Sequence, residues 1–260
     1  MDWRLIVDAV PRCGAENMAF DQALLEGVQA GGRPVLRLYR WAPACLSLGR
    51  NQPTPGRSLA NSAAARGIDV VRRPTGGGAV YHDRELTYAV AVPVGALGTP
   101  RESYHAVHRA LAVGLRRLGV AAEPAAVGGP GPRGGSPVGT CFRAAAPGEV
   151  VVGGRKLVGS AQRCERRTLL QHGSILVEDG QRVVAELLGE AAPRAETGAT
   201  SLATLLNGVP SWPELVAAVV AGFEMAAGIA FARAGASRAE LRRIRDLTAH
   251  FRSAAWTWRR

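Results

Sequence analysis

Apolar and polar residues alternate in short runs through the first two thirds of the chain, and each run predicts a β-strand. The runs are DWRLIVD, PVLRLYRW, ACLSLG, IDVVRR, ELTYAVAVPV and TLLQHGSILVE. The stretch GEVVVGGRKLVGSAQ, residues 148–162, predicts a β-hairpin. The chain is therefore expected to build most of its sheet before residue 180.

Apolar residues at helical spacing interrupt these strands. Residues 14–32 predict an amphipathic helix, with Met18, Leu24, Leu25 and Val28 near one face and glycines at its end. A polar helix should end near residue 66, another should cover residues 101–119, and the pattern is mostly helical after residue 181, most clearly at 211–228. Because helices interrupt the strands irregularly, we predict an α/β (α+β) fold, a mixed β-sheet with packed helices, rather than a regular βαβ series.

The length of the chain suits a single domain covering residues 1–260. Residues 121–140 differ from the rest because they consist largely of Ala, Gly and Pro, as in GGPGPRGGSPVG. Such a segment predicts a long mobile loop, of the kind often found over active sites.

The charge balance favours anionic partners. Lys and Arg number 32 against 21 Asp and Glu, a formal net charge of +11. Nucleic acid, an anionic membrane and an acidic carrier protein all fit this charge, but no block of consecutive basic residues marks a nucleic-acid-binding arm. The N-terminus has no secretory signal pattern, and no uncharged apolar run reaches the roughly 18 residues of a membrane span. We therefore expect a cytoplasmic protein.

The cysteines and histidines give no pattern of a metal site. Cys13, Cys45, Cys141 and Cys164 form no CxxC pair, which favours packing thiols, expected at Cys13 and Cys45, or one catalytic thiol. His105 and His108 are three residues apart on the predicted helix, but no third ligand accompanies them, so no metal is expected. These two histidines and His250 are expected at the surface.

The segment RRPTGGGAVYHD, residues 72–83, contains three consecutive glycines. Its spacing matches neither a phosphate-binding P-loop nor a dinucleotide-binding fingerprint, and a strand follows where those motifs need a helix. One interpretation is a hairpin turn, in which glycines supply positive φ. The other is a backbone that closely approaches a carboxylate, phosphate or thioester ligand, with Arg73, Tyr81 and His82 beside it.

A second candidate is the pair Cys141 and Lys156, fifteen residues apart. A neighbouring ammonium stabilises a thiolate, so a lysine on an adjacent strand could activate a nucleophilic cysteine. On this pair alone, a buried packing cysteine and a solvated lysine are the more common interpretation. Cys164, eight residues after the lysine, could compete as the thiol.

Three ordered motifs resemble one known family. RRPTGGGAVYHD, GRKLVGSAQ and QHGSILV together resemble the lipoate protein ligase and octanoyltransferase family, which is related to biotin protein ligases. The resemblance implies the fold of that catalytic domain, an acyl pocket lined by Gly76, Gly77 and Gly78, and an active-site lysine at Lys156. It also places the substrate-binding candidates in the matching motifs: Arg73, Tyr81, His82, Gly159, Ser160, Ala161, Gln162, His172 and Gly173.

Cys141 begins a Cys-Phe segment that resembles the octanoyltransferase branch of this family. That resemblance implies that Cys141 takes an octanoyl group from acyl carrier protein as a thioester. The acceptor would be a lysine of a lipoyl domain or of a glycine-cleavage H-type protein, and no cofactor would be needed. Lys156 would stabilise the thiolate and position or deprotonate the incoming amine.

Two alternatives stay open. GGGAVYHD is closer to the ligase form of the loop, and the segment after Cys141 lacks the Pro-Ser-aromatic run associated with the transferases. An ATP-dependent lipoate protein ligase, using ATP and Mg²⁺, is therefore the alternative enzyme. A non-catalytic basic nucleic-acid-binding protein is the alternative of another class, but basic runs with interleaved aromatics are missing and aromatics are only 5% of the chain. Neither nucleic acid nor membrane is thus an expected partner.

Overall fold

A computed structural model describes residues 2–54, 56–126, 141–189 and 198–259. The strands in these ranges are β1 (Asp2–Val7), β2 (Val35–Tyr39), β3 (Cys45–Leu48), β4 (Asp69–Arg72), β5 (Val80–His82), β6 (Glu85–Pro93), β7 (Glu123–Pro124), β8 (Val150–Val152), β9 (Arg155–Lys156), β10 (Val158–Glu165), β11 (Thr168–Leu176) and β12 (Ala230–Arg233). The helices are α1 (Gly14–Gln29), α2 (Arg57–Ala65), α3 (Pro100–Arg116), α4 (Arg182–Leu188), α5 (Leu202–Leu205), α6 (Trp212–Ala227), α7 (Arg238–Arg252) and α8 (Ala254–Thr257).

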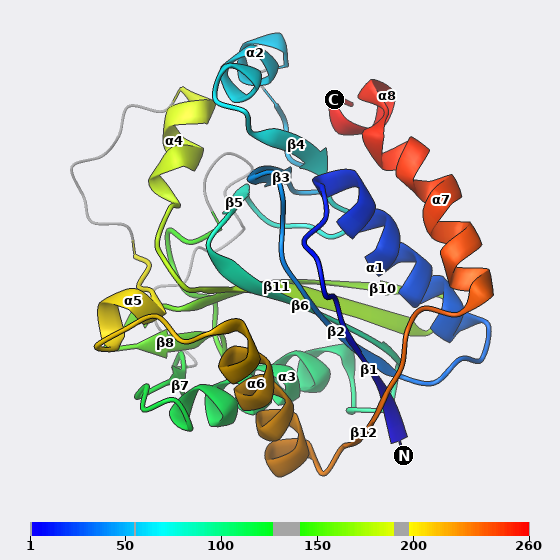
Figure 1. Cartoon of the computed structure of the whole chain (residues 1–260), viewed down its shortest axis with the longest axis vertical. Helices are drawn as coiled ribbons and strands as arrows, with labels where there is room; N and C mark the ends of the chain where they lie inside the picture. Colours follow the sequence, from blue (N-terminus) through cyan, green and yellow to red (C-terminus); the bar gives the residue numbers. More distant parts are fainter. Residues whose placement is uncertain (1, 55, 127–140, 190–197, 260) are drawn as a thin grey trace.

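The centre of the molecule is a six-stranded mixed sheet in the order β10-β11-β6-β2-β1-β12. Strand β1 pairs in parallel with β2 and β12, whereas β2, β6, β11 and β10 pair antiparallel. Helices α1 and α7 pack together on one face of the sheet, and α3 and α6 pack together on the other (Figure 1). Every residue of β6 except Pro93 is buried, as expected for a strand covered on both faces. The predicted fold class is confirmed.

Local sequence signals fix where the longer helices begin. Helices α3, α6 and α7 each start with a capping box, in which the N-cap hydroxyl residue and a glutamate three positions later exchange hydrogen bonds. The N-cap residues are Thr99, Ser211 and Ser237, and Gly228 ends α6 in a left-handed conformation. These helices pack around the central sheet, and that sheet carries the site described below.

The stretch predicted as one hairpin is divided between two sheets. Strands β8 and β9 form a hairpin around Gly153 and Gly154, both at positive φ, next to β7. The chain then leaves this hairpin, and β10 pairs with β11 at the edge of the central sheet. The hairpin expected over residues 148–162 is therefore wrong in its second half. Because the pairing changes after β9, Lys156 lies where the three-stranded sheet β7-β8-β9 meets the central six-stranded sheet.

Part of the predicted loop over residues 121–140 is a strand. Glu123 and Pro124 form β7 and pair with β8, and residues 127–140 lie outside the described part of the chain. No helix within the described ranges is long and apolar enough to cross a membrane.

Candidate active site

Lys156 lies beside Cys141 in a buried position. Its Nζ donates a hydrogen bond to the carbonyl oxygen of Cys141 at 2.8 Å and lies 3.9 Å from the Cys141 sulfur. Only 2% of Lys156 is exposed, whereas Cys141 is half-buried. The backbone N–H of Cys141 donates to the carbonyl oxygen of Ala79, which ties this segment to the glycine-rich loop. The pair expected from spacing is thus brought into contact.

Glu149 fixes the position of the Lys156 ammonium. Its Oε2 lies 2.6 Å from Nζ, and the carboxylate also accepts hydrogen bonds from the Tyr104 hydroxyl and the backbone N–H groups of Ala146 and Ser160. Burial alone would lower the pKa of Lys156, but its interactions with Cys141 and with the Glu149 carboxylate outweigh burial and raise that pKa. Lys156 is therefore an ammonium at neutral pH.

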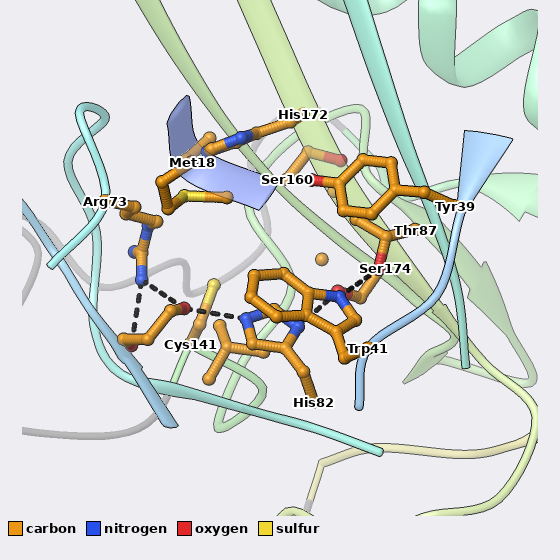
Figure 2. A pocket seen from close by; sticks show the side chains of 15 residues that line it. Met18, Tyr39, Trp41, Arg73, His82, Thr87, Cys141, Ser160, His172 and Ser174 are labelled. Carbon is orange, nitrogen blue, oxygen red and sulfur yellow. Dashed lines mark hydrogen bonds between the residues drawn. The ribbon is translucent and has the colours of Figure 1, made fainter. Parts of the chain in front are cut away.

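Cys141 lines a cavity between the central sheet, α1 and the glycine-rich loop. Figure 2 shows the side chains of Met18, Arg73, Cys141 and His82 arranged around it. Its empty volume is about 350 Å³, part of it open solvent. The residues that line it are Met18, Tyr39, Trp41, Ser47, Arg73, Val80, His82, Thr87, Cys141, Gly159, Ser160, Ala161, His172, Gly173 and Ser174.

The buried guanidinium of Arg73 explains the glycine-rich loop. It donates to the carbonyl oxygens of Gly76 and Gly78 and to the carbonyl and hydroxyl of Ser47. Burial lowers its pKa, the nearby Cys141 thiolate opposes that shift, and Arg73 has no carboxylate partner among the described residues. Gly77 adopts φ +91°, and a Cβ there would lie 2.9 Å from the guanidinium. The loop therefore wraps around a positive charge at the wall of the cavity.

Two histidines on the cavity wall are held by carboxylates. Nδ1 of His172 lies 2.9 Å from Asp21, and its Nε2 lies 2.6 Å from the hydroxyl of Thr75. His82 has the same arrangement, with Nδ1 2.7 Å from Glu85 and Nε2 2.7 Å from the Ser47 hydroxyl. Burial lowers the pKa of His172, although Asp21 opposes this, so the imidazole of His172 is neutral at pH 7.

His82 also stacks on an aromatic ring. The rings of Trp41 and His82 are 4.0 Å apart and nearly parallel, at 13° (Figure 2). The Trp41 indole N–H donates to the Thr87 hydroxyl at 2.7 Å. Together these contacts make one wall of the cavity rigid and largely aromatic.

Glycines on β10 and β11 make room for the site. A Cβ at Gly159 would approach the Phe142 ring to 2.7 Å, and one at Gly173 would lie 2.4 Å from the carbonyl oxygen of Gly159. Phe142 is 1% exposed, and the Lys156 ammonium lies 5.2 Å from its ring centroid. Glycine at position 159 therefore leaves room for Phe142, the neighbour of Cys141, and glycine at position 173 allows β10 and β11 to approach closely.

The candidate residues divide into two groups. Those that line the cavity are Arg73, His82, Cys141, Gly159, Ser160, Ala161, His172 and Gly173. Gly76 and Gly78 accept hydrogen bonds from Arg73, with Gly77 between them, and Lys156 contacts Cys141 without lining the cavity. Tyr81 packs on Gly180, and Gln162 donates to Pro100 and Gln171. Neither Tyr81 nor Gln162 is among the residues lining the cavity.

The prediction that His108 lies at the surface is wrong. His108 is fully buried, its Nδ1 lies 2.9 Å from the Tyr104 carbonyl oxygen, and its Nε2 lies 2.9 Å from the Ser160 hydroxyl. The Ser160 hydroxyl also contacts Tyr88 at 2.7 Å. The sequence signal that could have found His108 is its place on the apolar face of α3, between the buried Val107 and Leu111.

The other cysteines lie away from Lys156. Cys164 is exposed on β10, Cys45 is buried in the core as expected, and all four cysteines are free. Asp83 is exposed. Within the described ranges, no group of three His, Cys, Asp or Glu side chains could hold a metal ion.

Comparisons with known proteins agree with this geometry. Residues 13–224 match the lipoyl protein ligase A/B catalytic domain. The chain is 39% identical over 246 residues to an octanoyltransferase LipM of Symbiobacterium thermophilum, covering 88% of this chain and 87% of that protein. It is 36% identical to an octanoyltransferase LipM of Kyrpidia tusciae, covering 99% of both chains.

The fold is shared with a solved ligase. The bipartite lipoate protein ligase of Thermoplasma acidophilum, studied together with its E2 lipoyl domain, superposes with a TM-score of 0.79 at 21% identity, covering 99% of this chain and 96% of that one. On the family match and the identity to its relatives, this chain belongs to the lipoyl protein ligase A/B catalytic domain family.

Proposed function

We propose that this protein is a cytoplasmic octanoyltransferase that forms an octanoyl thioester on Cys141 and passes the acyl group to a lysine of a lipoyl-domain or glycine-cleavage H-type protein. The observation that carries the proposal is the half-exposed Cys141 sulfur 3.9 Å from the buried ammonium of Lys156, at the wall of a cavity. Relatives that align with 87% or more of their length bear the name octanoyltransferase, which supports the same reaction.

The chemistry runs in two balanced steps. The Cys141 thiolate attacks the carbonyl carbon of a carrier-bound octanoyl thioester, a new carbon–sulfur bond forms, and the carrier sulfur leaves with the bonding electrons. The amine of the acceptor lysine then attacks the Cys141 thioester, and the Cys141 thiolate leaves as the amide forms. The proton lost by the amine balances the one gained by the carrier thiol, so no cofactor or energy source is consumed.

The state of Lys156 restricts its role in these steps. Because its pKa is raised, it stabilises the attacking and leaving Cys141 thiolate as an ammonium rather than accepting the proton of the amine. His172 is neutral and lines the cavity, but Asp21 and Thr75 occupy its two ring nitrogens, so it is not assigned as the base. The backbone N–H of Ser160 donates to Glu149 and is therefore not free to stabilise the oxyanion. The positive charge of Arg73, on the cavity wall near Cys141, supports the carbonyl oxygen instead.

The ligase alternative uses the same cavity differently. In that reaction Lys156 would contact an acyl-adenylate, Cys141 would be incidental, and ATP with Mg²⁺ would be required. The buried contact between Cys141 and Lys156 favours the transferase, because a ligase has no use for a thiolate. The names of the relatives argue against a non-catalytic nucleic-acid-binding protein.

Transfer to an apo-lipoyl domain tests the proposal. Octanoyl-acyl carrier protein, the purified enzyme and the domain are mixed without ATP, and the domain is weighed by mass spectrometry. The transferase gives an octanoylated domain under these conditions. A product that forms only from free octanoate or lipoate, with ATP and Mg²⁺, would assign the ligase reaction instead.

A further inference from the structure

A second hollow, here the basic groove, lies between α1, α7 and α8. Arg50, Pro74, Arg163, Arg243, His250 and Trp256 are among the residues that line it, and its empty volume is about 830 Å³, part of it open solvent. Figure 1 shows α7 beside α1, with α8 following at the C-terminal end of the chain. None of these residues has a role in the chemistry described above.

The basic groove lies directly beside the cavity of Cys141, because three segments line both. On α1, Met18 lines the cavity and Gln22, one helical turn later, lines the groove. Arg73 faces the cavity, and the next residue, Pro74, faces the groove. On β10, Ala161 lines the cavity, and Arg163, on the same side of the strand, lines the groove. A molecule seated in the groove would therefore border the entrance to the cavity.

The groove holds positive charge that the protein does not neutralise. Arg259 stacks on Trp256 at 3.8 Å and donates to the carbonyl oxygen of Arg50, whose guanidinium lies 5.8 Å from the same ring. Neither Arg50 nor Arg259 forms an ion pair with any described residue. Burial, and then repulsion from Arg50, lowers the pKa of both Arg163 and Arg259. Three guanidinium groups are thus held close enough to repel one another.

Acidic residues near the groove do not cancel this charge. Glu26 lies in the groove but pairs with Arg243 at 2.6 Å, and Arg163 pairs with Glu165. Asp246 also lines the groove and acts on Arg243. The positive charge that has no acidic partner therefore lies on Arg50 and Arg259, beside the ring of Trp256. Such a combination of unpaired arginines and a half-buried aromatic ring is typical of a surface that binds an acidic protein.

We propose that the basic groove docks the acidic face of the carrier protein that delivers the octanoyl group to Cys141. The inference rests on the proposed transferase function, because that reaction requires a protein-bound thioester to reach the cavity from solvent. The groove gives the carrier a fixed place beside the entrance, and complementary charge accelerates the encounter.

Three donors that differ in one feature each separate docking from chemistry. They are octanoyl-acyl carrier protein, octanoyl-4′-phosphopantetheine, which keeps the phosphate of the carrier's prosthetic arm, and octanoyl-pantetheine, which lacks it. The second-order rate of Cys141 acylation is measured by intact mass for wild type, Arg50→Glu and Arg163→Glu. Arg109→Glu, which makes the same charge change at an exposed position on α3, is the matched control.

We expect Arg50→Glu and Arg163→Glu each to slow acylation by the carrier protein about tenfold relative to octanoyl-pantetheine, with a weaker salt dependence than wild type. Arg109→Glu should keep the wild-type ratio. If Arg163→Glu unfolds, Arg50→Glu still tests the proposal, because the Arg50 side chain forms no hydrogen bond or ion pair with the described residues.

Two results would overturn the docking proposal while leaving the transferase intact. An equal slowing with octanoyl-4′-phosphopantetheine would show that the groove binds only the phosphate. An unchanged rate with the carrier protein, combined with slower transfer to the acceptor domain, would show that the groove serves the acceptor. Failure of the wild type to be acylated by any donor would instead contradict the proposed function itself.

Discussion

The Nζ of Lys156 lies 2.6 Å from the carboxylate of Glu149 and 3.9 Å from the sulfur of Cys141. Both Lys156 and Glu149 are almost completely buried, at 2% and 1% exposure. A buried ammonium is stable only beside a partner of opposite charge. Glu149 therefore acts as the positioning residue for Lys156, and the ammonium in turn supports the thiolate.

This relationship predicts that removing the Lys156 charge lowers both the stability of the protein and the reactivity of Cys141. Lys156→Met leaves the Glu149 carboxylate buried without its partner, which should lower the free energy of unfolding by about 3–5 kcal/mol. Iodoacetamide should also alkylate Cys141 more slowly at neutral pH, because the ammonium that stabilises the thiolate is gone. Urea unfolding and mass-resolved alkylation measure the two effects.

The double variant Lys156→Met/Glu149→Gln is the control for this prediction. Removing both charges should recover most of the lost stability and part of the alkylation rate, because the unpaired Glu149 carboxylate of the single variant repels the thiolate. If Lys156→Met alone alkylates as fast as wild type, Lys156 has no electrostatic influence on Cys141.

The glycine-rich loop offers a matched pair of substitutions. Gly77→Ala places a side chain at φ +91° and 2.9 Å from the Arg73 guanidinium, whereas a Cβ at Gly76 meets nothing within 4 Å. We expect Gly77→Ala to cost about 1 kcal/mol or more of stability and to slow Cys141 acylation by displacing Arg73. Gly76→Ala should acylate like wild type. Equal acylation rates in the two variants would separate the loop from the site.

The buried His108 makes the free energy of unfolding depend on pH. Burial lowers the pKa of His108 to about 3, from an ordinary value of 6.5. Above this ordinary value the imidazole is neutral in both the folded and the unfolded chain. Below it only the unfolded chain gains a proton, so the free energy of unfolding falls by up to about 1.4 kcal/mol per pH unit as the pH is lowered toward the folded-state pKa.

Urea unfolding between pH 4.5 and 7 checks this prediction. His108→Gln should show a shallower loss of stability with acid than wild type, although His172, whose pKa burial also lowers, keeps part of the dependence. Identical slopes would mean that His108 is already solvated in the native protein.

The sequence predicted much of the fold because apolar periodicity is a local signal. The runs that became β1, β2, β6 and β11 alternate or stay apolar over five or more residues, and the capping boxes mark helix starts directly. Strand β12 was not predicted, because its four residues, AFAR, show no clear alternation of apolar and polar positions. None of the four is fully buried where the strand pairs with β1. The division between β9 and β10 depends on pairing with β11, which no local pattern encodes.

The site was predictable only as far as its motifs extend. The Cys141–Lys156 contact and the family followed from ordered motifs, and the family is confirmed. The sequence did not predict the roles of Glu149 and His108, because each role depends on a contact that forms only in the folded chain. Glu149 contacts Lys156, and His108 contacts Ser160. The one local signal for Glu149 was its position directly before the apolar run VVV, where a carboxylate would be buried and would need a cationic partner.

The central claim, a covalent octanoyl group on Cys141, is tested most directly by intact-mass analysis. The enzyme is mixed with octanoyl-acyl carrier protein, without ATP and without an acceptor, and the modified residue is located by peptide mapping. The account predicts one octanoyl adduct, on Cys141, that appears in Cys164→Ala and is absent from Cys141→Ala. An adduct on Cys164, or no adduct in a protein that still transfers octanoate when ATP is supplied, would contradict it.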